Sequence, residues 1–166
     1  MKPIIIVGSS RKEGATGKVA TQLQELVGAD LIHLIDCKIA PYDYEYRNRE
    51  DDFLPLMEKL LATYDTFIFA TPVYWYSMSA QMKTFFDRLS DLLRVEKGLG
   101  RKLRGKNMAV LNSSAGDNLG DGFWLPFKAS AKYLGMNYLA SLHTYEGENA
   151  EMELEKFASE ISAVSV

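Results

Sequence analysis

Short apolar runs alternate along the chain with stretches whose apolar residues recur at helical spacing, and this alternation constrains the fold more than any other feature. The apolar runs are rich in β-branched residues, which is typical of buried strands. They occupy residues 3–7, 30–35, 66–71, 107–112 and 137–143. Helical patterns follow them in residues 17–28, 54–61, 82–93, 123–134 and 149–164. Strands and helices in strict alternation predict a parallel sheet with helices on both faces.

Right-handed crossovers leave two topologies for five such strands joined by small loops. We favour the order 2-1-3-4-5, a flavodoxin-like three-layer α/β sandwich that forms one domain over residues 1–166. Ligands of open parallel sheets bind beyond the carboxyl ends of the strands, where the strand order reverses. That point lies between the first and third strands. We therefore expect a site built from the loops at residues 8–17, 71–79 and 112–122.

Composition excludes several classes of protein. The 19 Lys and Arg against 22 Asp and Glu give a net charge of −3, which argues against a nucleic-acid binder that works through a basic field. One cysteine and two histidines cannot form a disulfide or a Cys/His zinc site. The first apolar run spans five residues, too few for a signal peptide or a membrane-spanning helix. We expect a cytoplasmic protein with no membrane partner.

The loop "GSSRKEGATGK" lies between the first strand and the first helix. The start of a helix offers free backbone N–H groups and a positive dipole end, both of which suit a phosphate group. The spacing fails both the Walker pattern and the dinucleotide fingerprint. The alternative is an ordinary loop in which Thr16 caps the helix. The donors that the loop offers to a phosphate are Ser9, Ser10, Arg11 and Thr16.

The stretch "TPVYWYSMSAQMKTFFDR", residues 71–88, places three consecutive aromatic residues between a strand and a helix. Tyr74, Trp75 and Tyr76 either seal a core or subunit contact, or border a flat ligand.

These two stretches together resemble the NADPH-dependent FMN reductase family, in its phosphate loop and in its flavin-ring loop. The preceding "DDFLPLMEKLLATYDTFIFA" is also similar to the family, so the resemblance covers most of residues 3–93. The branch it resembles contains iron–sulfur flavoproteins and their cluster-free relatives. Only Cys37 stands where the cluster ligands would lie, and a cluster needs four ligands, so we expect no iron–sulfur cluster.

The resemblance implies noncovalently bound FMN. Its phosphate would be held by Ser9, Arg11, Gly14, Thr16 and Gly17, with Ala15 where many members have Asn. Its ring would be bordered by Pro72, Val73, Tyr74 and Trp75. Ser77 and Ser79 would lie near the ring or cap the next helix. Ser113, Ser114 and Gly116 of the third loop could also approach the ring, because they are small and lie at the same edge of the sheet, although an ordinary loop explains them almost as well.

The resemblance implies an FMN-dependent NAD(P)H oxidoreductase. No catalytic side chain is expected, because the hydride would move to and from the flavin itself. The acceptor would be a quinone, free flavin, nitro or azo compound, or a metal complex. The alternative is a flavodoxin-like electron-transfer protein reduced by a partner protein. A homodimer or homotetramer is expected. We expect His33 and His143 to be structural or exposed, and the basic segment 94–106 to be a solvated loop rather than an NADPH contact.

Overall fold

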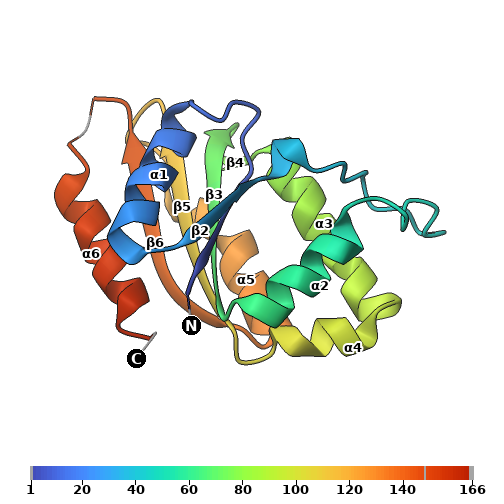
Figure 1. Cartoon of the computed structure of the whole chain (residues 1–166). Coiled ribbons are helices and arrows are strands. Elements are labelled where there is room, and N and C mark those ends of the chain that lie inside the picture. The colour runs from blue at the N-terminus through green and yellow to red at the C-terminus, as the bar shows by residue number, and fades with distance from the viewer. Residues whose placement is uncertain (1, 148, 165–166) are drawn as a thin grey trace.

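The computed structural model describes residues 2–147 and 149–164. A parallel sheet forms the middle layer in the order β2-β1-β3-β5-β6, which confirms the predicted order 2-1-3-4-5 (Figure 1). Its strands are β1 (Ile4–Val7), β2 (Asp30–His33), β3 (Thr66–Tyr74), β5 (Asn107–Ser114) and β6 (Asn137–Tyr145). A sixth strand that the sequence pattern did not predict, β4 (Ser77–Met78), pairs antiparallel with the end of β3.

Helices cover both faces of the sheet (Figure 1). One face carries α1 (Ala15–Val27) and α6 (Glu151–Ser162), and the other carries α2 (Phe53–Thr63), α3 (Ala80–Arg94) and α5 (Leu125–Leu134). A short α4 (Lys97–Gly100) follows α3. The described residues also form three 3-10 turns, η1 (Leu34–Asp36), η2 (Arg101–Leu103) and η3 (Asp121–Trp124). None of the described helices is long and apolar enough to cross a membrane.

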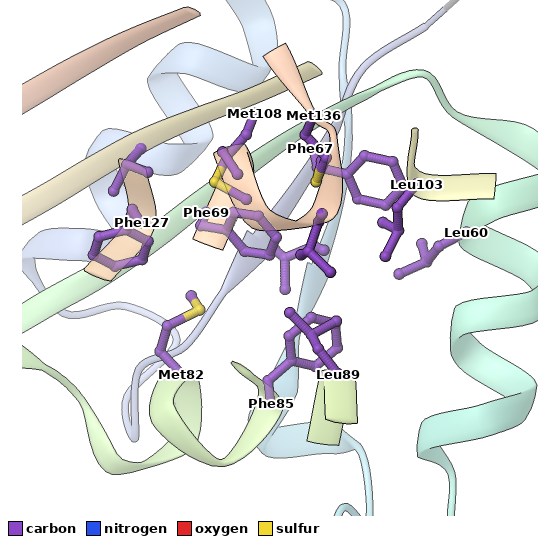
Figure 2. Close-up of a cluster of buried hydrophobic side chains, with 14 of the residues drawn as sticks. Leu60, Phe67, Phe69, Met82, Phe85, Leu89, Leu103, Met108, Phe127 and Met136 are labelled. Atoms are coloured by element: carbon purple, nitrogen blue, oxygen red, sulfur yellow. The ribbon is translucent and has the colours of Figure 1, made fainter. Parts of the chain in front are cut away.

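Alternation along the strands divides the core into two clusters. Ile4 and Ile6 face α2 and α3, whereas Ile5 and Val7 face α1 and α6, and all four are fully buried. On the first face, aromatic and methionine side chains from strands and helices meet in one layer (Figure 2). A strand buried on both faces is why residues 3–7 are continuously apolar.

Two predicted segments differ in part from the structure. The predicted loop at residues 94–106 is wrong, because α4 and η2 lie there. The basic side chains of this segment are exposed as predicted, except that of Lys106, which is buried. Its ammonium group donates to Asp65 at 2.9 Å and to the carbonyl oxygen of Tyr64 at 2.6 Å. The helix predicted over 123–134 begins as the 3-10 turn η3 and becomes α-helical at Leu125.

Candidate functional site

A cleft of about 1090 Å³ opens at the carboxyl ends of the parallel strands, over the face that carries α1 and α6. The topology predicted a site at this edge. The cleft brings together ten residues predicted from the sequence: Ser9, Arg11, Gly14, Ala15, Thr16, Pro72, Val73, Tyr74, Ser113 and Ser114. Its lining does not include Gly17, Trp75, Ser77 or Gly116.

The first turn of α1 forms one end of the cleft. Gly14 is the N-cap residue, no side chain caps the helix, and no acidic residue lies in the first turn. The first backbone N–H groups of a helix have no partner within it, and the dipole makes this end positive. Thr16 lies inside the helix and is buried, so the alternative in which Thr16 caps the helix is wrong.

Gly17 does not line the cleft but packs against the backbone of the loop that precedes α1. A Cβ at this position would lie 1.7 Å from the carbonyl oxygen of Lys12, closer than any real contact. The missing side chain therefore lets the loop fold back against the start of α1. Ser9 shapes the same loop, since its buried hydroxyl donates to the carbonyl oxygen of Arg11 at 3.0 Å and accepts from the Arg11 N–H at 3.3 Å.

The aromatic stretch forms a tight hairpin between β3 and β4. Tyr74 pairs with Ser77, so Trp75 and Tyr76 are the only residues of its loop. Their φ angles are +49° and +60°, in the left-handed region that a two-residue hairpin of this hand requires. Asn-Gly is the preferred pair there, and bulky residues with positive φ cost about 1–3 kcal/mol each. Such strain concentrates at binding sites and active sites.

The hairpin also shows which aromatic ring borders the cleft. Tyr74 lines it, whereas Trp75 is 95% exposed and Tyr76 is 62% exposed at the tip. Neither tip ring seals a core within this chain.

Buried hydrogen bonds join the hairpin to the first loop. The Ser79 hydroxyl caps α3 by accepting from the Met82 N–H at 3.1 Å, and it donates to the carbonyl oxygen of Gly8. The Ser79 N–H donates to the hydroxyl of Thr71 at 3.0 Å. Gly8 has no room for a side chain, because a Cβ would lie 2.9 Å from Cβ of Met82. The two loops are therefore held in one fixed relation.

The third loop contributes a side-chain pair that the sequence pattern did not suggest. The Ser114 hydroxyl lies 2.6 Å from Nε2 of His143 and donates to the carbonyl oxygen of Gly116 at 2.6 Å. Next to it, the Thr144 hydroxyl donates to the carbonyl oxygen of Asn112 at 3.0 Å. His143 is thus tied to a cleft residue instead of being an isolated histidine.

Sequence reasoning missed one wall of the cleft. The end of β6 and the start of α6 form it, together with the exposed face of α1. Their side chains include four carboxylates, Glu25, Glu146, Glu151 and Glu155, and the cationic Arg11 and Lys18 line the same cleft. The helical pattern of α6 was visible, but only the fold brings its first turns to the carboxyl ends of β5 and β6.

Outside the cleft, a buried ion-pair network fixes the segment that follows β2. Arg88 of α3 is fully buried and donates to Asp91 at 2.8 Å, to the carbonyl oxygen of Ala40 at 3.0 Å and to both oxygens of Asp51. Burial opposes ionisation of Asp51, but hydrogen bonds from Arg88 and from the N–H groups of Ala40 and Phe53 outweigh it. The pKa of Asp51 therefore lies below its usual value.

The sequence was also compared with known proteins. "Putative NAD(P)H-dependent FMN-containing oxidoreductase YwqN" of Bacillus subtilis (strain 168) is 34% identical over 100 residues, which cover 57% of this chain and 55% of YwqN. The match thus spans about half the length of that relative.

Solved structures share the fold across the whole chain. The Trp repressor binding protein from Bacillus subtilis has a TM-score of 0.73 at 23% identity, covering 98% of this chain and 99% of that one. General stress protein 14 from Treponema denticola, in complex with FMN, has a TM-score of 0.64 at 19% identity. The match covers 99% of this chain and 98% of that one. The family model described as NADPH-dependent FMN reductase matches residues 1–149. The chain therefore belongs to the NADPH-dependent FMN reductase family, an FMN-binding family.

Proposed function

We propose that this chain is an NAD(P)H oxidoreductase that holds FMN in the cleft and passes electrons to a small acceptor. The observation that carries the proposal is the meeting, in one cleft, of the uncapped start of α1 and the strained aromatic hairpin.

The end of the cleft at α1 fits the phosphate group of FMN. Free N–H groups at a helix start and a positive dipole favour a dianion. Arg11 adds a guanidinium that binds phosphate oxygens in pairs. No acidic side chain lies in the first turn, and no side chain caps the helix.

The middle of the cleft fits a flat ring system. Pro72, Val73 and Tyr74 of β3 present apolar surface, and Ser113 and Ser114 of the adjacent β5 present small polar groups. Trp75, Ser77 and Gly116 lie next to these residues in the chain and stay predictions as ring contacts.

When bound, FMN supplies the chemistry, because it accepts a hydride from a nicotinamide and releases electrons to a second substrate. The residues of this chain bind and orient it. The fixed relation between the first loop and the hairpin sets the distance between phosphate and ring sites. We propose that nicotinamide and acceptor occupy the open side of the cleft in turn, and that the acceptor is a quinone, flavin, nitro or azo compound, or a metal complex.

An absorbance titration of the purified protein with FMN tests cofactor binding, followed by stopped-flow mixing with NADH and with NADPH. We expect FMN uptake at micromolar concentration and rapid bleaching of the flavin band by at least one nicotinamide. Bleaching by neither, with reduction by a partner protein, would support the flavodoxin-like carrier. No uptake of FMN would contradict both functions.

Neighbouring cations provide a matched pair of variants. Arg11 lines the cleft, whereas Lys12 pairs with Asp36 at 2.7 Å outside it. A charged hydrogen bond contributes about 1.5–3 kcal/mol, so Arg11→Ala should weaken FMN binding by about 10-fold to 100-fold. Lys12→Ala should bind FMN almost as tightly as the wild type.

A further inference from the structure

The carboxyl ends of β5 and β6 place Ser114 and His143 side by side. Register pairs Asn112 with His143 and Ser114 with Tyr145, so these side chains belong to adjacent strands. The Ser114 hydroxyl lies 2.6 Å from Nε2 of His143. Ser114 lines the cleft, and the half-buried His143 stands behind it, outside the lining residues.

The hydrogen bonds of Ser114 fix the direction of each contact. A serine hydroxyl has one proton to donate and two lone pairs to accept with. Its proton is donated to the carbonyl oxygen of Gly116 at 2.6 Å. The contact with His143 must then be an N–H of the imidazole donating to the hydroxyl oxygen, so Nε2 carries a proton. One lone pair of Ser114 remains.

We propose that Ser114 acts on the bound ligand only as a hydrogen-bond acceptor, and that His143 is the positioning residue that imposes this direction. The inference rests on the proposed function, since FMN is the ligand in question. FMN carries two kinds of donor that such an acceptor recognises, the imide N–H of its ring and the hydroxyls of its ribityl chain. An acceptor held in this way selects a donor and rejects a carbonyl oxygen at the same place.

Without His143 the hydroxyl is free to turn. It could then release Gly116 and donate to the ligand, and the turn at residues 114–116 would lose one of its hydrogen bonds. The direction, rather than the mere presence of the hydroxyl, therefore depends on His143.

Titration of FMN fluorescence quenching against three variants tests this role. We expect His143→Leu and Ser114→Ala each to weaken FMN binding by about 2-fold to 10-fold, the range for one neutral hydrogen bond. His143→Gln keeps an N–H donor at a similar reach and should restore most of the affinity. In a protein that already carries Ser114→Ala, adding His143→Leu should lower the affinity for FMN only slightly further. Ser141→Ala removes an exposed hydroxyl from the same strand, outside the cleft, and should bind FMN like the wild type.

Two further measurements separate the possible failures. Nitrogen NMR of the ligand-free protein should show a protonated Nε2 at His143, and an unprotonated Nε2 would overturn the inference whatever the ligand is. FMN methylated at the imide nitrogen identifies the donor. If the imide N–H is the donor, methylation should weaken binding to the wild type more than to Ser114→Ala. If methylation weakens binding equally in the wild type and in Ser114→Ala, the donor is a hydroxyl of the ribityl chain.

If the wild type does not bind FMN, the proposed function fails. If it binds FMN and His143→Leu or Ser114→Ala binds equally well, the inference about Ser114 and His143 fails and the proposed function stands.

Discussion

Gly17 decides how closely the first loop packs against the start of α1. The space that a methyl group would need is taken by a backbone atom, the carbonyl oxygen of Lys12, which no side-chain rotation can move. Gly14, three residues earlier, is different, because the nearest atom to a Cβ there would lie at 3.5 Å. Its φ of −71° is open to any residue.

Alanine substitutions at these glycines should therefore diverge. We expect Gly17→Ala to lower the free energy of unfolding by about 1–3 kcal/mol, because an overpacked site must shift its backbone. Gly14→Ala meets no such clash and should lower it by about 0.5–1 kcal/mol, since alanine is a poorer N-cap residue than glycine. Urea unfolding of the ligand-free proteins measures both. Equal losses in the two variants would mean that the contact with Lys12 is not what restricts residue 17.

Among the elements, the β3–β4 hairpin has a strained backbone at its two tip residues, whose rings are exposed. Replacing Trp75 and Tyr76 by Asn and Gly should raise the free energy of unfolding by about 1–2 kcal/mol, since this pair suits the turn. A double alanine variant removes the rings but keeps both Cβ atoms, so it should retain the strain. Thermal unfolding of the two variants separates backbone strain from ring contacts. No stabilisation by Asn-Gly would show that the rings, not the turn, determine the stability of the hairpin.

The Arg88 network joins α3 to the segment between β2 and α2. Asp51→Asn should lower the free energy of unfolding by about 3 kcal/mol, the lower end for breaking a buried pair, because Asp91 still pairs with Arg88. Asp87→Asn breaks an exposed pair with Lys83 and should change it by less than about 1 kcal/mol.

The same network makes stability depend on pH with a defined sign. The folded-state pKa of Asp51 lies below its unfolded value of about 4. Its contribution is therefore fully present above about pH 4 and is lost as the pH falls through the folded-state pKa. Acid unfolding curves of the wild type and Asp51→Asn should converge below that pH. A gap that stays constant into strong acid would contradict the assignment.

Elements were predicted well where the hydrophobic pattern alone determines them and poorly where tertiary contacts do. The strand at residues 4–7 was predicted from its continuous apolar sequence, which is typical of a strand buried on both faces. The ends of β3, β5 and β6 run two or three residues further than predicted, because polar residues such as Ser113 and Thr144 still pair with neighbouring strands. The site was predicted at the correct edge of the sheet. The Ser114–His143 pair was not, since no local pattern joins residues so far apart in the chain.

At the scale of the whole molecule, α6 belongs to the site although the family match ends at residue 149. Its buried residues, Leu154, Phe157, Ala158 and Ile161, pack with those of α1 and the sheet. Glu151 and Glu155 face the cleft. We propose that residues 1–166 fold as one domain, and a homodimer or homotetramer stays a prediction.

Charge across the molecule should govern which acceptors react quickly. The net charge is −3 and four carboxylates line one wall of the cleft. These negative charges repel an anionic acceptor such as ferricyanide. At 0.1 M salt the repulsion is largely screened at distances beyond about 10 Å. Reoxidation of the reduced protein by ferricyanide should therefore speed up as salt is added, whereas a neutral quinone should show little change. A ferricyanide rate that falls with salt would indicate a cationic approach path.

The link from Ser79 to Gly8 has a consequence for protein engineering. A chimera that took only the hairpin of a relative would keep a first loop matched to a different neighbour, and one that took only the first loop would have the converse defect. The smallest interchangeable part is thus discontinuous in sequence, with Gly8 and residues 71–79 transferred together.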